Sequence, residues 1–132
     1  MARPSSLAAP SQELVLCALR KHKAPMTAYG LLDALKKTGI KSPPIIYRAL
    51  AALVQQGVVH HIHALGAFVA CNCSHEHTHD LSVLTVCNRC QRVDELHDHE
   101  VIHHLGKLRK MEVNLPSHAV IELPVICHAC AA

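Results

Sequence analysis

The chain has 132 residues, of which 50% are hydrophobic but only 2% aromatic, so any core must be built from Leu, Val, Ile and Ala. The formal charge of +3, with 13 His counted as neutral, permits nucleic-acid binding without demonstrating it. No apolar run approaches the length of a membrane span and no secretory signal is recognisable. We therefore expect a cytoplasmic protein with no membrane partner, whose seven Cys serve metal binding and not disulfides.

Two helices are predicted in the first third of the chain. Pro10 opens the first helix and Pro25 ends it, and Cys17 within it has no neighbouring ligand, so we interpret Cys17 as a small core residue. Thr27 is the predicted N-cap of a second helix over 28–37, which Gly39 ends.

A third helix follows after a very short turn. Ser42 is its predicted cap, and Pro43 and Pro44 form its first turn, where missing amide donors cost little. Helical spacing turns one apolar face inward and leaves Tyr47 and Arg48 on the outside. Two strands, over 58–63 and 67–71, then form a hairpin.

This order of elements is that of a winged helix-turn-helix, in which the third helix enters the DNA major groove. Arg48 can hold guanine or clamp a phosphate, and Tyr47 can contact a thymine methyl group or a phosphate. An exposed Arg and a half-buried Tyr are by themselves ordinary surface residues. The helix order and the Pro-Pro start favour DNA contact.

The second half of the chain is rich in metal ligands. It contains two CxxC pairs, and each pair can aim two thiolates from one turn at a single ion: Cys87 and Cys90, then Cys127 and Cys130. Four thiolates suit a tetrahedral zinc ion with no open position, so the predicted site is structural. Strands over 81–86 and 91–96 flank the first pair. A helix capped by Asp98 or His97 runs to about 111, and a last strand over 119–126 precedes the second pair.

The predicted fold class is therefore α+β. We expect a winged-helix DNA-binding domain over 1–72, a His-rich hinge over 73–80 and a zinc-stapled α/β dimerisation and metal-binding domain over 81–132. A second copy of the chain can cover the exposed edges of such a small sheet, which predicts a homodimer.

The segment Pro43-Pro44-Ile45-Ile46-Tyr47-Arg48-Ala49-Leu50, followed by Gly57-Val58-Val59-His60, resembles the ferric uptake regulator family. Members carry a P-x-T-V-Y-R-x-L segment on the DNA-reading helix, two CxxC pairs and a His-rich hinge, and the resemblance covers about residues 11–130. Ile45 and Gln91 depart from the usual Thr and Gly, but neither departure removes a ligand. Cys71, at the end of the second hairpin strand, makes the zinc uptake regulator branch the most similar.

The resemblance implies a second, regulatory zinc site. Its ligands would be His60, Cys71, Glu95 and a hinge His, which is His79 or, because the hinge looks one residue out of register, His77. One thiolate, two imidazoles and one carboxylate suit zinc better than Fe(II). We thus expect two zinc ions per chain. A third site stays open, with these candidates: His97, His99, His103, His104 and His118.

The resemblance further implies a zinc-responsive transcriptional repressor that binds a palindromic double-stranded DNA operator as a metal-loaded homodimer and represses zinc-uptake genes. Two alternatives remain. Cys71 argues against an iron or peroxide sensor of the same family, and a zinc-buffering or carrier protein would explain the His content but not Tyr47 and Arg48. No catalytic residue is assigned: we interpret the chain as lacking both the H-x-E motif of a zinc deaminase and the H-E-x-x-H motif of a zinc hydrolase, and we expect no enzyme.

Overall fold

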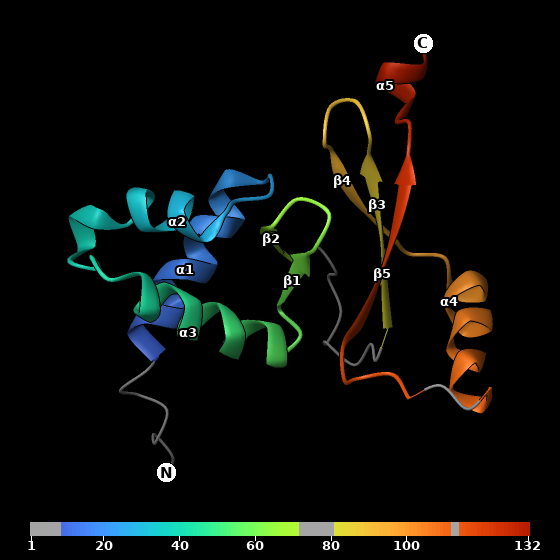
Figure 1. Ribbon diagram of the computed structural model, residues 1–132, viewed down its shortest axis with the longest axis horizontal. Helices are drawn as coiled ribbons and strands as arrows, with labels where there is room; N and C mark the ends of the chain where they lie inside the picture. Colours follow the sequence, from blue (N-terminus) through green and yellow to red (C-terminus); the bar gives the residue numbers. More distant parts are fainter. Residues whose placement is uncertain (1–8, 72–80, 112–113) are drawn as a thin grey trace. The chain divides into compact units, whose positions relative to one another are not determined.

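The computed structural model describes residues 9–71, 81–111 and 114–132 of the chain (Figure 1). It divides into two compact units, 1–71 and 72–132, and each unit is considered by itself. The predicted hinge over 73–80 lies outside the described residues. Among the described helices, none combines the length and the apolar character that a membrane crossing requires.

The first unit contains three helices followed by a hairpin. These are α1 (Ala9–His22), α2 (Ala28–Ala34), α3 (Pro43–Gln55), β1 (Val59–Ile62) and β2 (Ala67–Ala70). Its core is aliphatic, as the composition requires, and takes buried side chains from every helix and from the hairpin: Val15, Leu19, Leu31, Ile46, Leu50, Leu53 and Val59. This order confirms the predicted winged helix-turn-helix.

The second helix is shorter than predicted. Thr27 does hold its N-cap, where the side chain accepts a hydrogen bond from the Gly30 N–H at 3.0 Å. The α-helix ends at Ala34 and tightens into the 3-10 turn η2 (Lys36–Thr38), where the Thr38 hydroxyl donates to the Leu35 carbonyl at 2.6 Å. Gly39 ends the segment with a φ of 97°, a left-handed conformation that suits glycine.

Ser42 holds the N-cap position of α3, but its side chain makes no capping hydrogen bond. The reason lies in the two residues that follow, because Pro43 and Pro44 have no N–H to offer. The next donor, the Ile45 N–H, already bonds the Ser42 carbonyl at 3.1 Å. The start of α3 is therefore set by proline geometry more than by a side-chain cap.

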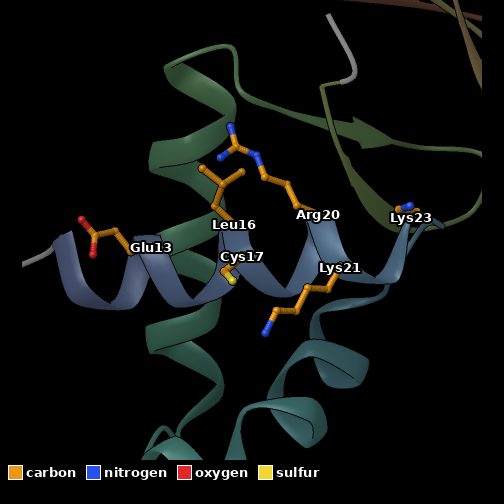
Figure 2. Close-up of a pocket in the computed structure, with 6 residues that line it drawn as sticks. All are labelled: Glu13, Leu16, Cys17, Arg20, Lys21 and Lys23. Carbon is orange, nitrogen blue, oxygen red and sulfur yellow. The ribbon is translucent and has the colours of Figure 1, made fainter. Parts of the chain in front are cut away.

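The interpretation of Cys17 as a core residue is wrong. Cys17 is exposed, and the buried positions of α1 are Val15 and Leu19. Cys17 lies two residues from each, which is about 200° around a helix and so on the opposite face. Figure 2 shows this outer face, where Cys17 lines a surface pocket together with Glu13, Leu16, Arg20, Lys21 and Lys23.

The second unit is a three-stranded sheet with a crossover helix. Its elements are β3 (Leu81–Cys87), β4 (Val93–Leu96), α4 (His99–Gly106), the 3-10 turn η3 (Lys107–Lys110), β5 (Ala119–Val125) and the short α5 (His128–Ala131). The strand order is β4-β3-β5. Strand β3 pairs antiparallel with β4 and parallel with β5. The apolar run of β3 is buried at every position except Thr85, as expected for the central strand of a sheet.

Replacing Thr27 by Ala should lower the free energy of unfolding by about 1 kcal/mol, because the Gly30 N–H then loses its acceptor. Ser42→Ala is the matched control: it also alters an N-cap, but one without a side-chain bond, and its loss should be clearly smaller. Urea denaturation of the zinc-loaded protein measures both values. Equal losses would show that the Thr27 hydroxyl has no special role.

Candidate metal centres and nucleic-acid interface

The four CxxC cysteines come together at one end of the sheet in the second unit. The parallel register of β3 and β5 sets Cys87 opposite Val125, so that the turn after β3 meets the turn after β5. The four sulfurs all lie within 4.8 Å of one another, and the Cys90 and Cys127 sulfurs are 3.7 Å apart. Zinc–sulfur bonds of about 2.3 Å in a tetrahedron place two sulfurs about 3.8 Å apart. The four thiols therefore fit a zinc ion.

Hydrogen bonds make these thiols unequal. The Cys127 N–H donates to the Cys87 sulfur at 3.4 Å, and the Arg89 N–H does so at the same distance. The Cys127 N–H, followed by that of Cys90, lowers the pKa of Cys87 to about 6. Hydrogen bonds with the Cys127 and Cys90 side chains, together with burial, raise the pKa of Cys130 to about 12. Without metal, Cys87 thus loses its proton more readily, and Cys130 less readily, than an ordinary thiol.

Arg89 joins the two halves of this cluster. Its guanidinium donates to the Cys130 carbonyl at 3.0 Å, and the Asn88 N–H donates to the Val125 carbonyl at 2.8 Å. These bonds hold the first CxxC turn against the C-terminal turn independently of any sulfur. The site is therefore partly preorganised for metal.

His60 and Cys71 lie close together on the hairpin of the first unit. His60 is opposite Val69, and the Cys71 N–H donates to the Val58 carbonyl at 2.9 Å, so Cys71 lies diagonally across from His60 on the same face. Their donor atoms are within 4.8 Å of each other, and His60 is only 3% exposed. The neighbouring His61 faces the other side, where its ring stacks on Phe68 with centroids 4.5 Å apart. The hairpin thus offers a buried nitrogen and a sulfur to one ion.

The other predicted regulatory ligands are not in the first unit. Glu95 is half-buried on β4 of the second unit, paired with Leu84 of β3. His77 and His79 lie outside the described residues. Their roles as ligands stay predictions.

The predicted DNA-contacting residues are exposed on α3. Tyr47 is 49% exposed and Arg48 is exposed beside it, whereas Ile46 and Leu50 on the opposite face are buried. Both side chains belong to the N-terminal half of the helix, which is the part that reads base edges in helix-turn-helix proteins. The outward orientation expected from helical spacing is confirmed.

Two further signals of a nucleic-acid interface were missed in the sequence. Tyr29, in the first turn of α2, is 65% exposed, although large aromatic side chains usually bury most of their area. The charge is also divided unevenly. Residues 1–71 hold eight Lys and Arg against two acidic residues, and residues 72–132 hold five against eight. Summing charge by unit, and not over the whole chain, would have revealed the basic unit.

The interpretation that the chain lacks an H-E-x-x-H motif is wrong. His99, Glu100 and His103 spell H-E-x-x-H at the start of α4, and all three are exposed. In zinc hydrolases the two His of this motif bind the metal and the Glu acts as base, with further ligands from elsewhere. Within the described parts of the chain, no third donor side chain clusters with the two His, so the hydrolase arrangement is not formed.

Comparison with known proteins places these features in a family context. The model of the ferric uptake regulator family matches residues 8–122. The zinc uptake regulation protein of Escherichia coli (strain K12) is 36% identical over 109 residues; the match covers 80% of this chain but only 61% of that protein's length.

Two solved structures of zinc uptake regulators are similar to this chain. A zinc uptake regulator complexed with zinc and DNA is similar with a TM-score of 0.77 and 32% identity, over 92% of this chain and 81% of the other. Holo XcZur is similar with a TM-score of 0.75 and 32% identity, over 92% of this chain and 84% of the other.

The number of protons released when the four-cysteine site of the metal-free, reduced protein takes up zinc should rise by about one as the pH is lowered through 6. Above this pH Cys87 is already a thiolate and has no proton to release, and below it Cys87 is protonated and must lose one. The apparent zinc affinity should therefore depend more steeply on pH below 6. Titration calorimetry in buffers of different ionisation enthalpy counts the protons, and a constant number from pH 5 to 8 would contradict the low pKa.

Proposed function

The chain belongs to the ferric uptake regulator family, and on this premise we propose that it is a zinc-responsive repressor. It acts in the cytoplasm, binds a palindromic operator as a metal-loaded homodimer and represses zinc-uptake genes. The observation that carries this proposal is the close nitrogen and sulfur pair of His60 and Cys71, on the hairpin that directly follows the exposed Tyr47–Arg48 surface. The similar proteins described above, a zinc uptake regulation protein and a regulator complexed with zinc and DNA, support it.

Two zinc ions per chain are proposed. The structural ion is held by Cys87, Cys90, Cys127 and Cys130, whose sulfur spacing suits it. The regulatory ion is held by His60, Cys71, Glu95 and His79, with His77 as the alternative to His79. A thiolate among imidazole and carboxylate donors favours zinc over Fe(II) and so disfavours the iron-sensor and peroxide-sensor alternatives.

DNA recognition is assigned to the basic first unit, taken as the domain 1–72. Arg48 and Tyr47 enter the major groove from α3, and α2 crosses the phosphate backbone with Tyr29 in its first turn. The excess of Lys and Arg in this unit supplies attraction for phosphates, and the acidic character of residues 72–132 keeps DNA on one part of the chain.

The second unit is assigned to dimerisation. In the part of the chain that the structure describes, its sheet ends in two edge strands, β4 and β5, beside which another chain could add a strand. Leu123 and Ile126, 43% and 44% exposed, add apolar surface at the β5 side. Pairing of two copies would cover both features and would give a dimer with two reading helices.

The regulatory ligands couple zinc to DNA binding. His60 and Cys71 belong to the DNA-binding domain, Glu95 to the dimerisation and metal-binding domain, and the hinge over 73–80 connects the two. A bound zinc ion supplies a cross-link between these donors. The ligand set then selects the arrangement of the two reading helices that matches the operator half-sites.

A gel-shift titration on the gene's own upstream region, with zinc and with a zinc chelator, tests the proposal. We expect a shift that requires zinc and is strongly weakened by Arg48→Ala, since loss of a bidentate base contact costs about 1–3 kcal/mol. Gln55→Ala, also exposed on α3 but at its C-terminal end, is the control and should bind normally. No zinc-dependent shift on any uptake-gene promoter would refute the function, and full binding by Arg48→Ala would refute the role of Arg48.

Cys71→Ser should leave a folded dimer that contains one zinc ion fewer per chain and no longer binds DNA in response to zinc. Cys17→Ser is the matched control, because Cys17 is exposed on α1 and is assigned no ligand role. Zinc content measured by mass spectrometry, together with circular dichroism, separates the outcomes. Unfolding of Cys71→Ser, or a zinc content equal to that of the control, would show that Cys71 is not a regulatory ligand.

A further inference from the structure

We propose that α4 carries a third metal site, in which His99 and His103 together bind one Zn²⁺ ion on the exposed surface of the second unit. This site is separate from the four-cysteine cluster and from the His60 and Cys71 pair. It does not depend on the proposed repressor function.

The helix that would hold the ion is well defined at its start. Asp98 is the N-cap, and its carboxylate accepts the Val101 N–H at 3.0 Å, while its carbonyl accepts the Ile102 N–H at 3.1 Å. Helix α4 packs against β3, and its half-buried side chains are Ile102 and Leu105. These contacts fix which face of α4 points to solvent.

Four donor side chains share that solvent face. They are all exposed, and each has a neighbour one turn away: His99, Glu100, His103 and His104. Within the described residues, no ion pair engages any of them. The His103 and His104 rings touch only edge-on, with centroids 5.7 Å apart, so His103 can turn toward His99 without breaking a hydrogen bond.

The spacing selects His99 and His103 as ligands. Residues four apart on a helix have Cβ atoms about 5–6 Å apart, which lets two imidazoles reach one ion with bonds of about 2.0–2.1 Å. The parallel pair Glu100 and His104 has the same spacing but combines a carboxylate with a single imidazole. Two neutral imidazoles suit Zn²⁺ better. Glu100 lies one turn before His103, where its charge favours a cation nearby.

The site differs from the other two metal sites in how tightly it should hold its ion. Two protein ligands leave the remaining coordination positions to water, so the ion should be held more weakly than by four thiolates. The site therefore fills only after the tighter sites are loaded. Among the described residues no third donor side chain clusters with the two His, so the three-ligand set of a zinc hydrolase is incomplete and we assign Glu100 no catalysis.

The test uses the full-length reduced protein, already loaded with its tighter zinc ions, and further ZnCl₂ as the probe. Calorimetry measures the weak binding step, and imidazole nitrogen chemical shifts, recorded residue by residue by NMR, report which His bind. His99→Gln and His103→Gln are the test variants. His104→Gln is the matched control, since His104 is an exposed neighbour on the same helix.

We expect the His99 and His103 nitrogens to shift together in the wild type, and each test variant to weaken this step by about tenfold or more, since even partners outside the metal's ligand shell are worth about 10–100-fold. His104→Gln should bind as the wild type does. Circular dichroism checks that every variant keeps its helix. The proposal fails if added zinc moves only hinge His signals, or if His104→Gln weakens binding as much as His103→Gln.

Discussion

The parallel pairing of β3 with β5 is the contact on which the second unit depends. Strand β4 runs antiparallel to β3 and so returns the chain to the end of the sheet where β3 began, and α4 then comes before β5, which runs parallel to β3 on its other side. The return brings the C-terminal CxxC turn next to the turn after β3, some forty residues earlier in the chain. Four thiols meet there because of strand register, and the Arg89 bond to the Cys130 carbonyl adds a link that does not involve sulfur. A zinc ion at this point ties the first and last elements of a unit whose aliphatic core is small.

The hairpin of the first unit also brings two metal-donor side chains together, and it does so within a shorter stretch of chain. Antiparallel register makes Cys71 a diagonal neighbour of His60 on one face, whereas His61 is turned to the other face against Phe68. The alternation of β-strand side chains thus decides which of two consecutive His can serve as a buried ligand. The hairpin also bonds the α1–α2 connection, where Met26 and Phe68 exchange backbone hydrogen bonds of 2.9 and 2.8 Å. A ligand pair on this hairpin is therefore fixed to the same body that carries α3.

Local signals in the sequence predicted most of the fold. Thr27, Gly39 and the Pro-Pro start of α3 marked helix ends by rules that need only neighbouring residues, and the four cysteines marked their site by spacing. The predictions failed where they needed the exact helical phase of a residue or a separate count of charge in each unit. Cys17 was expected in the core because it has no neighbouring ligand, but Val15 and Leu19 place the buried stripe on the other side of α1. The basic character of residues 1–71 was hidden because acidic residues further along cancel it in the total. The 3-10 turn that follows α2 is marked by bonds from the Thr38 N–H and hydroxyl to the Leu35 carbonyl, and no periodicity in the sequence reveals them.

The strongest metal site is not the one suited to regulation. All four cysteines belong to one unit, so an ion bound there stabilises that unit equally in every arrangement of the chain. A ligand that binds two conformations with equal affinity shifts neither of them, however tightly it binds. The proposed set of His60, Cys71, Glu95 and a hinge His draws donors from both units, and only some arrangements can satisfy all of them at once. The difference in zinc-binding free energy between arrangements is then the free energy available for switching. It arises because only the arrangements that bring all the donors together can bind zinc with the full set. For the same reason, the two His on α4 can bind an ion without altering DNA recognition, since both stand on a single helix.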